Sequence, residues 1–124
     1  MGAVSSQVKV VPLDSVDPIE LPKDSWSRMV VTASTVPEPT SSMGYSVFRP
    51  GMETGMVSHE VEEIAFVVQG RGELRLEDSV LTYGPGEALY IPQHTWHAVA
   101  NTGEEDVVMI FTFPHPDYPP TERR

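Results

Sequence analysis

The chain contains no cysteine among its 124 residues. This absence excludes a disulfide framework, a thiolate nucleophile and thiolate metal ligands, so any metal would need histidine, carboxylate or water as ligands. The sequence also lacks an apolar run of about 18 residues, the length of a membrane-spanning helix. Because no signal peptide is present either, we expect a soluble cytoplasmic protein with no membrane partner.

Basic residues are scarce as well. Eight Lys and Arg stand against 18 Asp and Glu, which gives a formal net charge of −10. Such a chain repels phosphate backbones and anionic membrane surfaces, so we expect no nucleic-acid partner. Twelve Pro and nine Gly are spread along the sequence and leave little room for long helices. Short strands joined by turns, and hence an all-β fold in one small domain, are predicted.

The chain divides into three segments by composition. Residues 1–40 are Pro-rich and polar and are predicted to form an extended N-terminal arm that packs on the rest of the domain or on a dimer partner. Residues 41–114 carry regularly spaced turn signals and are predicted to form a β-barrel. Residues 115–124 are predicted to be a flexible C-terminal tail. The first residues, 1–6, formally fit an N-myristoylation pattern, which no polybasic segment supports.

Short strands are predicted wherever apolar and β-branched residues lie between Gly or Pro turns. The predicted strands are 8–11 and 27–32 in the arm, then 45–48, a strand that contains both His59 and Glu63, 73–76, 80–83, 88–91, 97–100 and 107–113.

His59 and Glu63 are the first candidate functional residues. A separation of four is even, so on one strand both side chains would project from the same face. The sequence His59-Glu60 begins like the zinc-protease signature H-E-x-x-H, but Glu63 stands where the second histidine belongs. A zinc protease is therefore not indicated.

Two segments carry regular spacings. The first runs Gly51, five residues, Val57-Ser58-His59, three residues, Glu63, six residues, Gly70; the second runs Gly86, five residues, Pro92-Gln93-His94, two residues, His97, three residues, Asn101. In these spacings the chain resembles the cupin superfamily over about half its length. Two positions depart from the family pattern: Val57 stands where the family has a first histidine, and His94 replaces a glycine. The resemblance implies a cupin-type jelly-roll β-barrel that commonly dimerises and holds a divalent metal at its centre.

The resemblance also implies the metal ligands, which are His59, Glu63 and His97. Two histidines and one carboxylate can form a facial triad on non-haem iron, so Fe²⁺ is the favoured cofactor, with Mn²⁺, Ni²⁺, Co²⁺ or Zn²⁺ as alternatives. His94 could compensate for the imidazole missing at Val57, or it could lie at the surface or support a ligand.

Four further residues are candidates for the chemistry or for substrate binding. Tyr90, like Glu63, is a candidate general acid or base, with a core aromatic as the alternative. Arg49 could offer its guanidinium to a substrate carboxylate, or lie exposed at a strand edge. Val57 and Phe66, together with His94, are candidates for contact with the substrate in an apolar cavity.

Three functions are compatible with these residues. The first is a metal-dependent cupin enzyme that acts on a small oxygenated metabolite, as a Lewis-acid lyase or isomerase or as an O₂-dependent dioxygenase. The second is a metal-free acid–base dehydratase or cyclase, and the third is a cupin that binds a small molecule without turning it over. A homodimer is expected for each.

Overall fold

The computed structural model describes residues 7–124. The N-myristoylation pattern and the start of the predicted arm lie outside the described residues. Within 7–124 the chain is all-β, as predicted, apart from two short 3₁₀ turns, η1 (Leu13–Ser15) and η2 (Pro22–Asp24). No helix in this part of the chain is both long enough and apolar enough to span a membrane.

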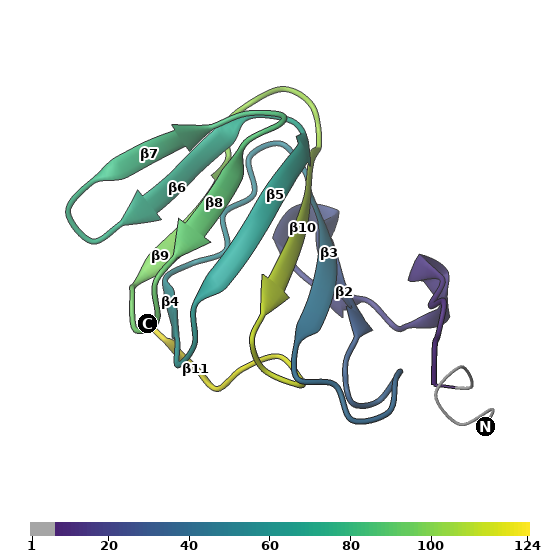
Figure 1. The fold of residues 1–124 in the computed structure, drawn as a ribbon. Helices are drawn as coiled ribbons and strands as arrows, with labels where there is room; N and C mark the ends of the chain where they lie inside the picture. The colour runs from purple at the N-terminus through teal and green to yellow at the C-terminus, as the bar shows by residue number, and fades with distance from the viewer. Residues whose placement is uncertain (1–6) are drawn as a thin grey trace.

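In the described part of the chain, eleven strands form two antiparallel sheets that pack face to face (Figure 1). One sheet has six strands in the order β1 (Ile19–Glu20), β2 (Trp26–Val31), β3 (Ser42–Phe48), β10 (Val107–Phe113), β5 (Glu63–Gln69) and β8 (Ala88–Ile91). The other has five strands in the order β11 (Thr121–Arg123), β4 (Val57–His59), β9 (His97–Asn101), β6 (Gly72–Leu76) and β7 (Val80–Tyr83). The predicted jelly-roll architecture is confirmed.

Strand β10 shows why these sequences form a two-layered fold. Its residues alternate strictly, with Val107, Met109, Phe111 and Phe113 buried and the residues between them partly exposed. A period of two places every second side chain on the inner face of a sheet. The core therefore lies between the two layers, where these side chains meet Val67, Leu74 and other residues of both sheets.

The turns explain two residues of the sequence pattern. Gly70 has a φ of 90°, and a Cβ there would lie 2.5 Å from the carbonyl oxygen of Asp106, so only glycine fits. Asn101 donates from Nδ2 to the carbonyl oxygens of Phe48 and Glu105, and its Oδ1 accepts from the backbone of Gly103. Gly70 thus allows the turn between β5 and β6, and Asn101 stabilises the turn between β9 and β10.

The ends of the chain differ from the prediction. The predicted strand 8–11 is absent, whereas the predicted strand 27–32 is present as β2, which pairs with β3 in the six-stranded sheet with a register shift between Met29 and Val31. The segment predicted to be a flexible tail instead contains β11, which pairs with β4 residue by residue from Thr121 opposite His59 to Arg123 opposite Val57. The C-terminal segment is thus part of the five-stranded sheet.

The strand predicted to contain both His59 and Glu63 is also corrected. It is two strands in different sheets, with β4 ending at His59 and β5 beginning at Glu63. Residues 60–62 form the bend that carries the chain from one layer to the other. His59 and Glu63 therefore face each other across the interior rather than from one strand face.

Candidate metal centre

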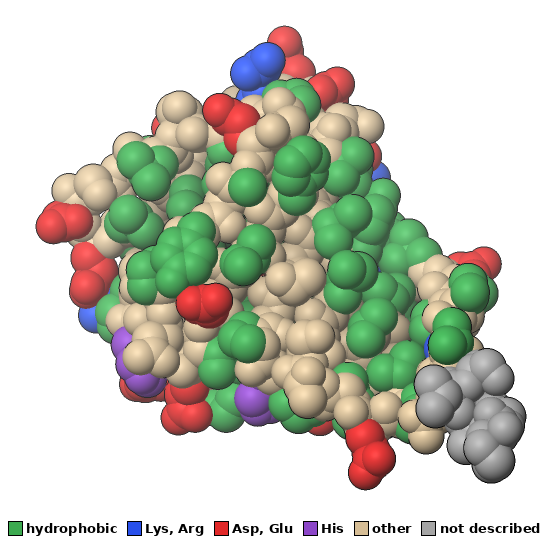
Figure 2. Space-filling model, viewed as in Figure 1, with side chains coloured by type: hydrophobic (Ala, Val, Ile, Leu, Met, Phe, Trp, Pro, Cys, Tyr) green, Lys and Arg blue, Asp and Glu red, His purple; other side chains and the backbone are tan. Residues whose placement is uncertain are grey.

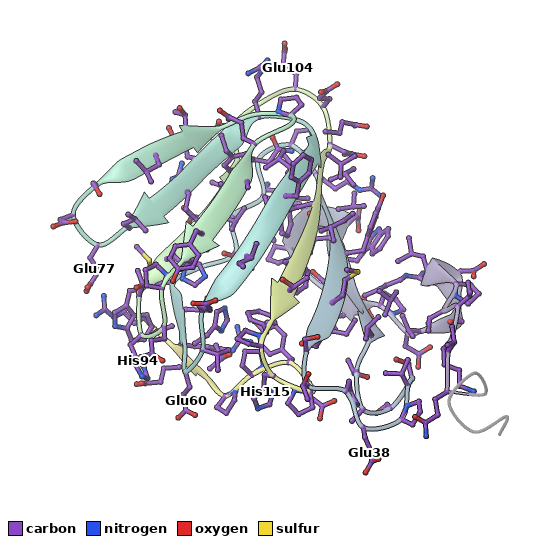
Figure 3. All side chains as sticks on the ribbon, in the orientation of Figure 1. Glu38, Glu60, Glu77, His94, Glu104 and His115 are labelled. Carbon is purple, nitrogen blue, oxygen red and sulfur yellow. The ribbon has the colours of Figure 1, made fainter. Side chains whose placement is uncertain are left out.

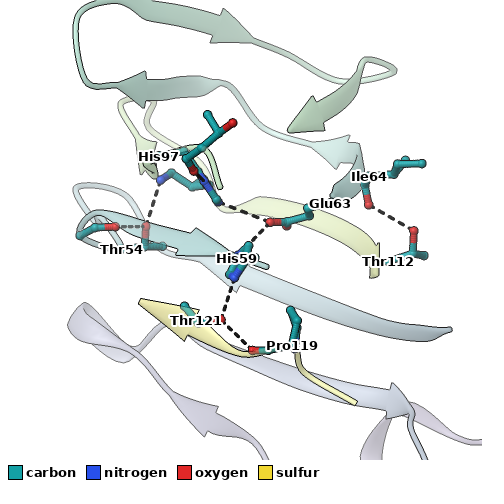
Figure 4. A network of polar contacts seen from close by, with 11 residues as sticks. Thr54, His59, Glu63, Ile64, His97, Thr112, Pro119 and Thr121 are labelled. Atoms are coloured by element: carbon teal, nitrogen blue, oxygen red, sulfur yellow. Dashed lines mark hydrogen bonds and ion pairs between the residues drawn. The ribbon is translucent and has the colours of Figure 1, made fainter. Parts of the chain in front are cut away.

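Three side chains converge in the interior between the sheets (Figure 4). His59 closes β4, Glu63 opens β5 and His97 opens β9. Glu63 Oε1 lies 3.3 Å from His59 Nε2 and 3.4 Å from His97 Nε2. Both histidines are buried, and the three donor atoms lie within 4.8 Å of one another. Residues that the sequence separates by almost forty positions thus meet at one point, as predicted.

Each imidazole is fixed by a hydrogen bond on its outer nitrogen. His97 Nδ1 lies 2.8 Å from the carbonyl oxygen of Thr95, which can only accept, so Nδ1 carries the hydrogen. His59 Nδ1 lies 2.8 Å from Thr121 Oγ1, which already donates its one hydrogen to the carbonyl oxygen of Pro119. His59 Nδ1 is therefore also the donor. In the neutral state both rings turn the lone pair of Nε2 toward Glu63.

The arrangement fits a metal ion. Two neutral imidazoles and an ionised carboxylate point three lone pairs at one another, and only a cation or a proton can make such a contact favourable. Ligand bonds of about 2.1 Å around one ion place neighbouring ligand atoms roughly 3 to 3.4 Å apart, close to the two distances observed. Imidazole and carboxylate are ligands that Fe²⁺, Mn²⁺, Co²⁺, Ni²⁺ and Zn²⁺ all accept.

Without an ion, protons take its place. Burial alone would raise the pKa of Glu63, but hydrogen bonds to His59 and His97 outweigh burial and hold the pKa below its usual 4.5. Burial alone would lower the pKa of His97, but its hydrogen bonds to Glu63 and to the carbonyl of Thr95 hold the pKa above 6.5. The pair therefore favours an ionised carboxylate beside a protonated imidazole.

A cavity of about 310 Å³ opens beside the three residues. Its wall is mostly apolar, formed by Leu21, Phe48, Val57, Val99, Met109, Phe111 and Phe113 among others. The polar groups in the wall include Ser27 and Ser46, whose hydroxyl oxygens lie 2.7 Å apart. This volume is at the lower end of the range for small-molecule sites, so the cavity suits a small, largely apolar ligand with a few oxygen atoms.

Val57 is one of the predicted substrate contacts that the structure places in the cavity wall. It is 8% exposed and lies directly opposite His97 in the β4–β9 pair. An apolar side chain thus occupies the position of the family's first histidine, and the three ligands leave that side of the site without a fourth.

The substrate-binding placements expected for Arg49 and Phe66 are corrected. Arg49 pairs with Asp106 at 2.7 Å and donates to the carbonyl oxygen of Asp24, and it does not line the cavity. Phe66 is 48% exposed, because the inward residues of β5 are its neighbours Ala65 and Val67. Neither residue is placed to contact a ligand beside the three-residue cluster.

Tyr90 and His94 also lie away from the cavity. Tyr90 is 61% exposed, pairs in register with Ile64 on the outer face and donates to Glu62 at 2.9 Å, so it is neither a core aromatic nor an acid or base of this site. His94 is exposed, in a turn with a φ of 58°, and Figure 3 shows it at the edge of the molecule. It does not replace the imidazole missing at Val57, although its backbone donates to the carbonyl oxygen of His59 at 2.7 Å.

Two cavity residues escaped the sequence analysis because they belong to the presumed tail. Tyr118 and Arg123 both line the cavity. The Tyr118 ring packs edge-on against His59 and Phe113, at centroid distances of 5.6 and 5.5 Å. Burial, and next the charge of Glu63, raise the pKa of the Tyr118 phenol, which therefore stays protonated at neutral pH. The β11–β4 pairing brings these two residues to the cavity, and no local feature of the sequence predicts that pairing.

Comparison with known proteins agrees with this architecture. A family model described as the cupin domain matches residues 44–113, more than half of the chain. The polyketide cyclase RemF from Streptomyces resistomycificus has the same fold, with a TM-score of 0.78 and 22% identity over 94% of this chain and 84% of that one. The chain therefore belongs to the cupin family.

Two relatives are similar in sequence. Protein SchB of Streptomyces halstedii is 29% identical over 116 residues, which cover 90% of this chain and 83% of that protein. The 5-nitrosalicylic acid 1,2-dioxygenase of a Bradyrhizobium species is 33% identical over 66 residues, 53% of this chain. The match spans only 32% of the dioxygenase. Enzymes therefore occur among the relatives of this chain.

Proposed function

We propose that this protein is a metal-dependent cupin enzyme that acts on a small oxygenated metabolite. One observation carries the proposal: three lone-pair donors, Nε2 of His59, Nε2 of His97 and a carboxylate oxygen of Glu63, meet in a buried site with both outer imidazole nitrogens already engaged. Three lone-pair donors directed at one point are favourable only with a metal ion or a proton among them, so this cluster is built to hold a positive charge.

His59, Glu63 and His97 would hold the ion, and Fe²⁺ remains the favoured one because two histidines and one carboxylate are the ligand set of non-haem iron enzymes. When bound, a divalent ion supplies Lewis-acid polarisation of a substrate oxygen or, as iron, redox chemistry with O₂. The chain's own residues do the rest. The apolar wall excludes water, and Tyr118 presents a protonated phenol near Glu63 that can donate to a substrate oxygen.

Lewis-acid chemistry of a lyase or isomerase is our first candidate, because it needs only the ion and the cavity described above. The O₂-dependent alternative is favoured by one observation, the 33% identity over 66 residues with the 5-nitrosalicylic acid 1,2-dioxygenase. Consumption of O₂ by the iron-loaded protein in the presence of a substrate would select the second.

The proposal is tested by metal analysis of untagged protein after dialysis. We expect about one equivalent of divalent metal per chain, since a preorganised buried site retains its ion. His97→Ala and Glu63→Gln each remove a ligand and should leave the protein with little metal. His94→Ala is the matched control, because His94 is exposed and outside the cluster.

Equal metal content in His97→Ala and in the unmodified chain would overturn the ligand assignment. A folded, metal-free wild type that cannot be loaded with Fe²⁺, Mn²⁺ or Zn²⁺ would leave the acid–base enzyme, in which Glu63 and the histidines move protons without an ion, as the function that these residues support.

A further inference from the structure

Arg123 has a special position in the sheet that carries the site. In the β11–β4 pair it lies directly opposite Val57, and in the β4–β9 pair Val57 lies directly opposite His97. Residues directly opposite each other in antiparallel strands project from the same face. Arg123, Val57 and His97 therefore form one row across three strands, and all three line the cavity.

Within residues 7–124, Arg123 has no carboxylate partner. Three other arginines form ion pairs: Arg49 with Asp106, Arg75 with Glu53 and Glu73, and Arg124 with Glu77. Among the residues that the structure describes, no carboxylate lies within 4.0 Å of the Arg123 guanidinium. Among the described residues that line the cavity, Arg123 is also the only Lys or Arg.

Comparison with Arg124 shows that the lack of a carboxylate partner is specific to the position of Arg123 in the sheet. Arg124 is next in the chain and points elsewhere, with its guanidinium 4.1 Å from the ring centroid of Trp96 and 2.8 Å from Glu77. In a strand, consecutive side chains lie on opposite faces. Arg124 thus contacts Trp96 and Glu77 away from the cavity, whereas the exposed side chain of Arg123 lines the cavity.

We propose that Arg123 binds a carboxylate group of the substrate, in the space beside Val57 where the family pattern has a histidine. This inference deepens the proposed function, since it names the substrate class: a small carboxylate with an apolar body and a further oxygen directed toward His59, Glu63 and His97. A planar guanidinium matches a carboxylate with two parallel hydrogen bonds.

Electrostatics explain why one cation is needed at this place. The molecule carries a formal charge of −10, and Glu63 adds a negative charge inside the cavity. An anionic ligand would be repelled without a compensating group. Arg123 is exposed and contacts the Tyr118 phenol, so it presents its guanidinium at the part of the cavity wall that is open to solvent, where a carboxylate can reach it.

The test compares benzoate with benzamide, two probes of the same shape that differ in charge. Binding is measured by isothermal titration with the EDTA-treated protein and again with the Zn²⁺-loaded protein. In the EDTA-treated protein we expect benzoate to bind about tenfold more tightly than benzamide, the usual scale of a charge-assisted pair. Arg123→Gln should abolish this preference, and Arg123→Lys should restore part of it. Arg124→Gln is the matched control and should keep the preference in full.

The inference is overturned if benzoate binds no more tightly than benzamide in the EDTA-treated wild type, or if Arg123→Gln keeps the preference. Because this comparison needs no ion, it is independent of the metal proposal. A chain that shows the Arg123-dependent preference but takes up no metal would refute the proposed metal site and support the carboxylate site.

Discussion

Glu63 is the residue on which the site depends most. Its carboxylate oxygen lies between two imidazole nitrogens that have no hydrogen of their own to offer in the neutral state. The contact is favourable only with a positive charge among the three groups, which a metal ion or a proton can provide. Metal binding and protonation therefore compete at this site, so the stability of the protein should depend on pH differently with and without the ion.

We predict that the metal-free protein is most stable in mildly acidic solution. The pKa of Glu63 is lowered, so its contribution is present above pH 4.5 and is lost as pH falls through the lower folded value. The pKa of His97 is raised, so its contribution is present below pH 6.5 and is lost as pH rises through the higher folded value. Urea unfolding in EDTA should give the highest free energy between these limits and a decline of about 2 kcal/mol toward alkaline pH, the scale of a buried charge-assisted hydrogen bond.

His97→Asn should remove the alkaline decline, whereas His94→Asn should keep it because His94 is exposed. The metal-loaded protein should behave in the opposite way, since the ion requires deprotonated imidazoles and stabilises the fold more as pH rises. A metal-free wild type whose stability increases steadily from pH 5 to 9 would contradict the proton-bridged arrangement.

At the scale of elements, most of the barrel could be predicted from the sequence. The strands β3, β6, β7, β8, β9 and β10 were expected within a few residues, because Gly and Pro turns separate their apolar runs. The bend at 60–62 was not expected. Glu60, Val61 and Glu62 include no Gly, Pro or Asn that would predict a turn, and their polar and apolar side chains alternate as in a strand.

The metal-ligand candidates could also be predicted, because the sequence around His59, Glu63 and His97 resembles the cupin motifs, which are local patterns. The other cavity residues were not. Phe66 and Tyr90 were expected near the ligand, but the outward face of β5 and β8 carries apolar side chains as well, so alternation alone does not identify the inner face. Tyr118 and Arg123 depend on a long-range pairing that a three-residue strand signals weakly.

Strand β11 leads to a prediction about metal affinity. Thr121 accepts the hydrogen of His59 Nδ1 and so keeps the Nε2 lone pair directed inward. Thr121→Val preserves the shape and removes this acceptor, and it should weaken Zn²⁺ binding about tenfold. A competition titration with a chromophoric chelator measures the change.

Thr112→Val is the matched control for this substitution. Thr112 lies in β10 opposite Ile64, on the outer side of the six-stranded sheet, where its hydroxyl makes only a long contact of 3.5 Å. Its Zn²⁺ affinity should equal that of the wild type. Equal affinities for Thr121→Val and Thr112→Val would show that β11 does not orient His59.

At the scale of the whole molecule, the outer face of the six-stranded sheet is apolar. Figure 2 shows hydrophobic side chains gathered over β5, β8 and β10. Two cross-strand rows form this apolar outer face: Tyr90, Ile64, Thr112 and Met43, and Ala88, Phe66, Ile110 and Tyr45. Neither row contains a charged residue, although the chain carries a formal charge of −10.

We propose that this apolar outer face binds a second copy of the chain in a two-fold symmetric dimer. Two strongly acidic molecules can approach most easily through a face with few charges, and burying Ile64, Phe66 and Tyr90, each 48% or more exposed, is favourable. Light scattering after size exclusion should give twice the mass of 13.7 kDa. Phe66→Lys should convert the dimer to a monomer.

The control is Val80→Lys, because Val80 is 51% exposed but lies on β7 at the edge of the other sheet. That variant should remain dimeric. A monomeric wild type would refute the dimer. A dimer that survives Phe66→Lys but dissociates in Val80→Lys would show that the interface lies elsewhere.

The ligands come from both layers of the fold. His59 and His97 belong to the five-stranded sheet, whereas Glu63 belongs to the six-stranded sheet. An ion held by all three would act as a cross-link between the layers, beside the cavity. Loss of the ion would then speed the separation of the sheets, so that the metal content of a sample would determine how long each molecule survives before it unfolds.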